Sequence, residues 1–139
     1  ILGQGSLLLE LRKQAELLGI AERVFFEGWV DREGIWDYYR DANLFILLSK
    51  AEALGIVFWE AMYLGVPALG STVSGIMETI GQDGERGRLW DEAEGADTFR
   101  SKVDFCLTPS HQREEMIARA KDYVVVQIAN PVTLNSLFL

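Results

Sequence analysis

The sequence is short of residues on which several classes of protein depend. Its 139 residues include one cysteine, Cys106, and one histidine, His111. A single cysteine cannot close an internal disulfide, so we expect a reducing, cytoplasmic environment. With one histidine, a histidine-rich metal cluster cannot be built, and we expect no Ser/His/Asp arrangement. We expect His111 to be solvated and Cys106 to pack in the core.

Basic residues are also scarce. Thirteen Lys and Arg against 21 Asp and Glu give a net charge of −8. This argues against nucleic acid as a partner, because phosphate backbones select basic surfaces. A small anionic ligand is still allowed, since backbone N–H groups at a helix N-terminus can hold a phosphate. No apolar run approaches the ~18 residues that cross a bilayer, and no signal peptide is recognisable.

The composition that remains is that of one globular domain: 49% hydrophobic and 24% charged residues. The chain opens on Ile1 at what resembles the end of a strand, and closes at Leu139 inside an expected helix. We therefore expect residues 1–139 to form one domain that is incomplete at both ends.

Short β-prone runs alternate with helical patterns along the first two thirds of the chain. This alternation predicts an α/β fold with a Rossmann-like, doubly wound parallel sheet. From Ala96 onward only helices are expected, with a break at Asn130 and a last helix from Pro131. The predicted strands are 1–2, 24–26, 44–48, 67–69 and 88–90, and the predicted helices begin near 6, 31, 55 and 75.

Two burial patterns follow from the spacing. Ser6 is expected to cap a helix whose buried face carries Leu8, Leu11, Ala15 and Leu18. The continuous apolar run 44–48 is typical of a strand that is buried on both faces. Ligands bind at the carboxyl ends of such strands, so the loops that start at Gly3, Gly28, Ser49 and Gly70 are candidates for a site.

The stretch from Ser49 to Gly65 is the most informative. Glu52 lies in the loop after a predicted strand, and Glu60 lies eight residues later on a helix that is apolar nearly all round. A carboxylate there needs partners. It could accept hydrogen bonds from a vicinal diol such as a ribose, or it could pair with an Arg or cap a loop; spacing alone favours neither.

Gly55 and Ile56 would lie at the N-terminus of this helix. Free N–H groups and the helix dipole favour a phosphate at that position, and a glycine lets a ligand approach the backbone. An ordinary strand-to-helix turn explains the same residues, and by themselves it is the simpler interpretation.

Together with Glu52 and Glu60, five stretches in one order resemble the C-terminal domain of retaining GT-B glycosyltransferases of family 4 (group 1). The resemblance covers the whole chain and implies a domain that binds a nucleotide-diphosphate sugar. The five stretches are V-F-F-E-G-W-V-D (24–31), Y-Y-R-D-A-N-L-F-I-L-L-S (38–49), E-A-M-Y-L-G-V-P-A (60–68), V-S-G-I-M-E-T-I (73–80) and D-G-E-R-G (83–87).

The resemblance also implies roles for single residues. Glu60 would bind the ribose hydroxyls of the donor, and Glu52 would face the donor sugar as the catalytic residue. The N–H groups of Gly55 and Ile56 would hold the distal phosphate, with Leu54 beside them in the donor site.

The backbone around Trp29 and Val30 would contact the nucleobase. Transfer would proceed with retention, without a metal or another cofactor, to an acceptor held by an N-terminal domain outside residues 1–139. The fragment alone would then be inactive. In the longer protein, a cytoplasmic position at the inner face of the membrane would also fit.

Departures from the family pattern keep a second interpretation open. Ala53 and Leu54 stand where the family often has Gly-Phe, and Thr72 stands where it often has Asp. A diverged, non-catalytic binding domain of the same fold would tolerate such changes.

The Arg and Lys that clamp the diphosphate in the family would precede Ile1, on the first strand of the sheet. That strand belongs beside the strand at 44–48. We expect a stable structure to fill its place, with the parent chain or with a second copy in a homo-oligomer.

Overall fold

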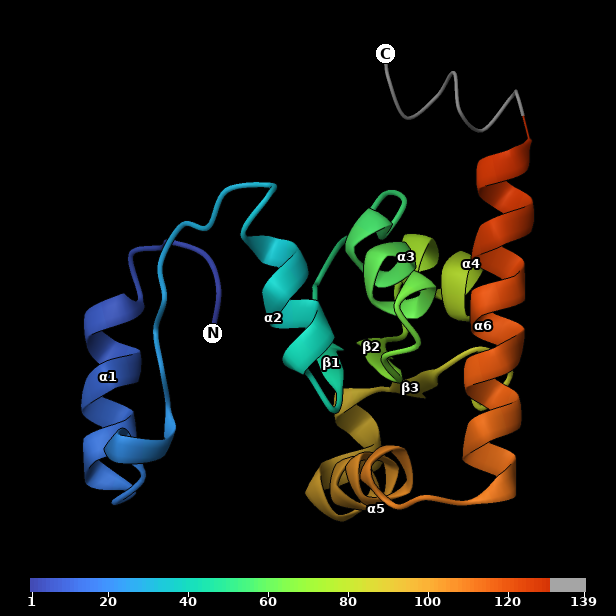
Figure 1. Cartoon of the computed structure of the whole chain (residues 1–139). Coiled ribbons are helices and arrows are strands. Elements are labelled where there is room, and N and C mark those ends of the chain that lie inside the picture. Colours follow the sequence, from blue (N-terminus) through green and yellow to red (C-terminus); the bar gives the residue numbers. More distant parts are fainter. Residues whose placement is uncertain (131–139) are drawn as a thin grey trace. The chain divides into compact units, whose positions relative to one another are not determined.

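The computed structural model describes residues 1–130, which divide into two units, residues 1–38 and the residues from Tyr39 onward. The predicted helix from Pro131 lies outside the described residues. Figure 1 shows the elements in chain order. They are α1 (Leu8–Leu17), the 3-10 helix η1 (Ala21–Arg23), α2 (Ile35–Asp41), β1 (Phe45–Leu47), α3 (Ile56–Tyr63), β2 (Ala68–Ser71), α4 (Ser74–Ile80), β3 (Arg88–Trp90), the 3-10 helix η2 (Glu92–Glu94), α5 (Gly95–Leu107) and α6 (His111–Ala129).

In the first unit, the chain start runs parallel to the segment after η1. Leu2 and Gly28 form a parallel bridge, and the Gly3 N–H donates to the Gly28 carbonyl at 2.6 Å. The Glu27 N–H donates to the Ile1 carbonyl at 3.0 Å. The segments predicted as strands at 1–2 and 24–26 therefore run close together, but neither forms a regular strand, and the single bridge falls at Gly28.

The prediction for α1 was wrong in two respects. Leu7, not Ser6, occupies the N-cap position, and no side chain caps the helix. Of the predicted buried face Ala15 is 6% exposed, but Leu11 and Leu18 are 40% and 64% exposed. A helix buries only the face that another element covers, and within residues 1–38 one extended segment and a single helical turn cannot cover a leucine-rich stripe.

The second unit contains a parallel sheet in the order β1-β2-β3. Leu47 pairs with Gly70, and Ser71 pairs with Trp90. Because consecutive strands are parallel, α3 and α4 are crossover helices, and Figure 1 shows them on one side of the sheet with α5 on the other. The predicted α/β, Rossmann-like class is confirmed.

The core lies between the sheet and the helices α3, α4 and α6. As expected for an apolar helix, α3 is largely buried. Cys106 of α5 is fully buried, as predicted, and burial raises the pKa of its thiol to about 11. The main cluster consists of Phe58, Trp59, Met62, Ala68, Ile76, Ile80, Leu89, Ala120 and Val124.

The expectation that the strand at 44–48 is buried on both faces was wrong. Ile46 is 41% exposed and Leu48 is 42% exposed. Among the described residues, β1 pairs with β2 on one edge and with no strand on the other. If strands from within residues 1–139 had paired with both edges of β1, the expectation of a missing first strand would have been contradicted. That pairing is not found in the part described, and the missing strand stays a prediction.

Candidate functional site

The three strands of the sheet end at one edge, where two hydrogen bonds join the loops that follow them. The Ser71 hydroxyl donates to the Ser49 carbonyl at 2.6 Å, which links the loops after β2 and β1. The Thr72 hydroxyl donates to the Asp91 carboxylate at 2.7 Å, which links the loops after β2 and β3. This carboxyl edge is where ligands bind in open α/β sheets.

Helix α4 holds the backbone of the loop between β1 and α3. The Gly75 N–H donates to the Glu52 carbonyl at 3.1 Å, and the Thr79 hydroxyl donates to the Leu54 carbonyl at 3.1 Å. The Trp59 indole N–H donates to the buried Thr79 oxygen at 3.0 Å. A Cβ on Gly75 would lie 2.4 Å from the Glu52 carbonyl oxygen, so the close approach requires glycine. The loop is therefore fixed at two of its carbonyls.

The Glu52 carboxylate turns back onto the N-terminal end of α3. One carboxylate oxygen, Oε1, accepts from the Ala53 N–H at 3.0 Å and from the Gly55 N–H at 3.2 Å. The positive end of the helix dipole favours a negative charge there. Glu52 thus occupies one of the two N–H groups to which the sequence assigned a phosphate.

The other predicted residues of this loop lie at the surface beside it. Gly55 is the N-cap of α3 with a φ of +60°, a left-handed conformation that suits glycine. Leu54 and Ile56 are 44% and 41% exposed. The Ile56 N–H belongs to the first turn of α3, where no intrahelical acceptor exists. The Ile56 N–H is thus left as a backbone donor next to the Gly55 N–H that Glu52 occupies.

Glu60 is half-buried on α3 and is held by a tyrosine. The Tyr39 hydroxyl donates to its Oε2 atom at 3.0 Å, and Tyr39 is only 4% exposed. No cation within the described part of the chain pairs with Glu60, so the expected alternative of an Arg partner is not found there. A carboxylate can accept about four hydrogen bonds, so one hydroxyl leaves most of this capacity unused.

The two remaining predicted residues, Trp29 and Val30, belong to the first unit. The Trp29 side chain is 71% exposed, and Val30 is half-buried. Gly28, with a φ of +72°, precedes them at the turn, and Asp31 accepts from the Gly34 N–H at 2.7 Å. The structure thus brings Glu52, Leu54, Gly55, Ile56 and Glu60 together in the second unit and leaves Trp29 and Val30 in the first.

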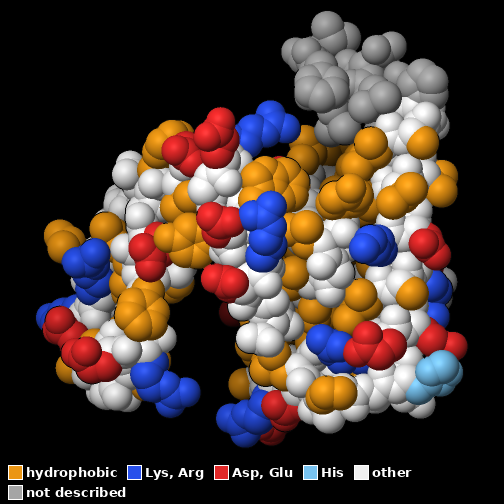
Figure 2. Space-filling view, viewed as in Figure 1, with side chains coloured by type: hydrophobic (Ala, Val, Ile, Leu, Met, Phe, Trp, Pro, Cys, Tyr) orange, Lys and Arg blue, Asp and Glu red, His pale blue; other side chains and the backbone are white. Residues whose placement is uncertain are grey.

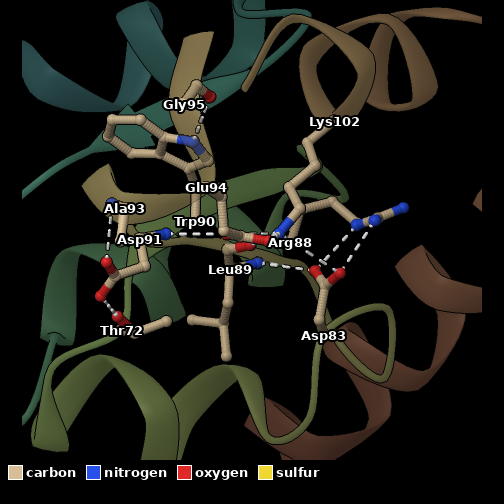
Figure 3. A network of polar contacts seen from close by, with 10 residues as sticks. All are labelled: Thr72, Asp83, Arg88, Leu89, Trp90, Asp91, Ala93, Glu94, Gly95 and Lys102. Carbon is tan, nitrogen blue, oxygen red and sulfur yellow. Dashed lines mark hydrogen bonds and ion pairs between the residues drawn. The ribbon is translucent and has the colours of Figure 1, made fainter. Parts of the chain in front are cut away.

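An ion network around the buried Lys102, at the end of β3, was not predicted (Figure 3). Lys102 of α5 is 7% exposed, and its ammonium lies 2.9 Å from Glu94 and 3.6 Å from Asp83. It also donates to the Leu89 carbonyl. Arg88 donates two hydrogen bonds of 2.9 Å to Asp83. The network fastens α5 to the end of β3.

The carboxyl groups of this network are held in the charged form. Burial alone would raise the pKa of Asp83, but hydrogen bonds from Arg88 and Leu89 and the nearby positive charges outweigh it, so the pKa is lowered. For Glu94, the Asp91 N–H and Lys102 lower the pKa. Both shifts indicate carboxylates that already have their partners.

Sequence reasoning missed Tyr39 and Lys102 as polar partners. Tyr39 entered the sequence analysis only as part of the stretch 38–49, and its acceptor Glu60 lies 21 residues away. For Lys102 a signal existed: it shares a helix face, at three- and four-residue spacing, with the apolar residues Phe99 and Cys106. A lone cation in such a face predicts a buried partner.

Other features of the described chain carry less chemistry. The single histidine lies at the surface at the start of α6 (pale blue in Figure 2), with its side chain 84% exposed, which confirms that His111 is solvated. In residues 1–130, no group of three or more His, Cys, Asp and Glu side chains is arranged to hold a metal ion. None of the helices in that range is both long and apolar enough to cross a bilayer.

Comparison with known proteins now adds to this geometry. The family model of glycosyl transferases group 1 matches residues 1–123. The chain belongs to this family. A curated relative, the N-acetyl-alpha-D-glucosaminyl L-malate synthase of Bacillus anthracis, is 35% identical over 127 residues, which are 91% of this chain and 32% of the relative.

Solved group 1 and GT-B structures share the fold. Anabaena Alr3699/HepE in complex with UDP and glucose matches with a TM-score of 0.79 and 22% identity, over 99% of this chain and 40% of that one. The C-terminal domain of the group 1 protein LpcC from Francisella tularensis matches with a TM-score of 0.71 and 23% identity, over 85% and 60%. The chain thus spans less than two thirds of each of these proteins.

Proposed function

We propose that this chain binds the nucleotide-diphosphate sugar donor of a retaining glycosyltransferase of family 4. The observation that carries the proposal is the state of Glu60. It is a half-buried carboxylate that has a single neutral donor among residues 1–130, and it lies close in sequence to the N-terminus of α3. Family membership supports the proposal, and so does the solved neighbour that contains UDP and glucose.

In this proposal each part of the loop and helix has one task. Glu60 accepts two hydrogen bonds from the ribose hydroxyls. The Ile56 N–H, with Gly55 and Leu54 beside it, receives the distal phosphate at the positive end of α3. Backbone near Trp29 and Val30 receives the nucleobase.

Glu52 has a more demanding role. Its carboxylate and the distal phosphate compete for the Gly55 N–H, because both are anions and this N–H already donates to Glu52 at 3.2 Å. We propose that phosphate displaces the carboxylate, which then turns to the hydroxyls of the donor sugar. Charge that develops on the leaving phosphate is stabilised by the dipole and N–H groups of α3, with no metal or other cofactor.

A non-catalytic binding domain is the second candidate. The contact between Glu52 and Gly55 favours it, because a carboxylate that stays on its own loop cannot turn to the donor sugar. The two candidates differ in turnover: an enzyme releases nucleoside diphosphate from a donor sugar, and a binding domain does not.

The wider setting is part of the proposal. The acceptor, a sugar, lipid or glycan, would be held by an N-terminal domain, with the diphosphate-clamping cations on a strand beside β1. That strand would come from the same protein or from a second copy in a homo-oligomer. We place the protein in the cytoplasm, with attachment to the inner face of the membrane as the alternative.

The test is titration of the full-length protein with UDP, GDP and ADP by calorimetry, followed by nucleotide release from the sugar forms of the one that binds. We expect one nucleotide to bind and Glu60→Gln to weaken it by roughly 1.5–3 kcal/mol. Wild-type affinity in the variant would refute the role of Glu60. Binding without nucleotide release would favour the non-catalytic candidate.

A further inference from the structure

The partner of Glu60 is a tyrosine that the fold holds rigidly. Tyr39, on α2, packs its ring edge-on against Phe45 of β1, with ring centres 5.7 Å apart and planes at 62°. Phe45 in turn packs edge-on against Phe58 of α3 at 5.1 Å and 84°. Edge-to-face pairs of this kind are favourable and directional. The phenol ring therefore cannot swing away from Glu60 without disturbing the core between β1 and α3.

The hydroxyl of Tyr39 has one hydrogen to donate, and both Glu60 and Val57 offer it an acceptor. The Glu60 Oε2 atom lies at 3.0 Å and the Val57 carbonyl at 3.3 Å. A charged carboxylate is the stronger acceptor, so the hydrogen is directed to Glu60. Burial, and then the charge and hydrogen bond of Glu60, raise the pKa of Tyr39 far above its ordinary value of 10.0, so the group stays a donor at any physiological pH.

We propose that Tyr39 is a positioning residue that fixes the Glu60 carboxylate for a ligand diol. A glutamate side chain has three rotatable bonds, and ordering it on binding costs affinity. A hydrogen bond to Oε2 from a ring seated in the core sets the carboxylate before the ligand arrives. It leaves Oε1 and the remaining capacity of Oε2 to accept the two hydroxyls. The inference rests on the proposed function, because it assigns Tyr39 to the same ribose contact.

The experiment is a double-mutant cycle in the full-length protein, with UDP as the probe. Tyr39→Phe keeps the ring and removes only the hydroxyl, so the edge-on contacts are retained. We expect it to weaken UDP binding about tenfold, and to have no effect beyond about twofold when Glu60→Ala is already present. Tyr63→Phe is the matched control: Tyr63 is a 45%-exposed tyrosine of α3, and its change should leave binding as in wild type.

The outcomes separate this inference from the proposed function. If Glu60→Ala binds UDP like wild type, the proposed function fails. If Glu60→Ala weakens binding but Tyr39→Phe does not, only the role of Tyr39 fails. An equal loss from Tyr39→Phe in both backgrounds would mean that the hydroxyl acts through folding alone and would also overturn the inference.

A second measurement needs no substitution. In a crystal structure of the wild-type protein with UDP, we expect the Tyr39 hydroxyl to stay within about 3.2 Å of the Glu60 carboxylate while the ribose contacts the same carboxylate. A Tyr39 hydroxyl that has left Glu60 for the Val57 carbonyl in that complex would contradict positioning.

Discussion

Two sets of carboxylates in the second unit have opposite environments. Asp83 and Glu94 lie against Arg88 and Lys102, in a network where each charge meets one of the opposite sign. Glu52 and Glu60 receive only neutral donors within the described residues, namely backbone N–H groups and one tyrosine hydroxyl. The first set is complete without a ligand, and the second is not.

On the proposed function, this difference separates structural carboxylates from those that bind the ligand. Both sets belong to the second unit, and Glu52 and Glu94 each lie in a segment that follows a strand, so position alone does not distinguish them. The presence of a cation does, because an ion pair satisfies a carboxylate and leaves it little reason to bind a diol or to change partner. The comparison can be tested by substitutions that remove the cation from the set of Asp83 and Glu94, or the negative charge from the set of Glu52 and Glu60.

The largest expected effect comes from the ion network. Lys102→Met should lower the free energy of unfolding by about 3 kcal/mol, because it leaves Glu94 and Asp83 without the buried ammonium between them. Urea unfolding monitored by circular dichroism measures this. Lys121→Met, at an exposed position of α6, is the matched control and should change stability by less than about 0.5 kcal/mol. If Lys102→Met lowers the free energy of unfolding no more than the control does, the ion network does not stabilise the fold as the comparison requires.

The next largest effect is expected on turnover, when Glu52 is substituted. Glu52→Gln keeps an oxygen for the Ala53 and Gly55 N–H groups, so the loop should keep its shape. If the carboxylate acts on the donor sugar, kcat should fall by on the order of 10²-fold while the KM for the donor changes little. Steady-state kinetics of nucleotide release measure kcat and the KM for the donor separately. A raised KM with unchanged kcat would reduce Glu52 to a binding residue.

The smallest effect concerns pH. The folded-state pKa values of Asp83 and Glu94 are lowered below their ordinary 3.8 and 4.5. Their contribution to stability is therefore complete above pH ~5 and is lost as the pH falls through the lowered values. Asp83→Asn should make the fall of stability between pH ~5 and ~3 less steep than in wild type. An unchanged slope would show that Asp83 does not titrate with the network.

The fold could be predicted wherever a local pattern determines it. The strand at 88–90 has the predicted bounds, and α3 begins directly after Gly55, close to its predicted start. Burial could not be predicted in the same way. Leu11, Leu18 and Ile46 are exposed, because burial depends on which element covers a face and not on the spacing of apolar residues along one segment.

In the candidate site, too, features within one segment could be predicted and contacts between segments could not. Glu52, Gly55 and Glu60 lie on one loop and one helix, so their spacing predicts that they lie close together. Their partners come from other elements: Tyr39 lies 21 residues before Glu60, and the Gly75 N–H that holds the Glu52 carbonyl comes from α4. No periodicity within a segment encodes such contacts.

The most direct test of the account is whether Glu60 recognises the ribose diol. Wild-type full-length protein and Glu60→Gln should each be titrated with UDP and with 2′,3′-dideoxy-UDP, with Glu78→Gln, an exposed glutamate of α4, as the control. We expect wild type and the control to bind UDP at least about tenfold more tightly than the dideoxy form, and Glu60→Gln to show about threefold discrimination or less. Equal discrimination in wild type and Glu60→Gln would contradict the central claim.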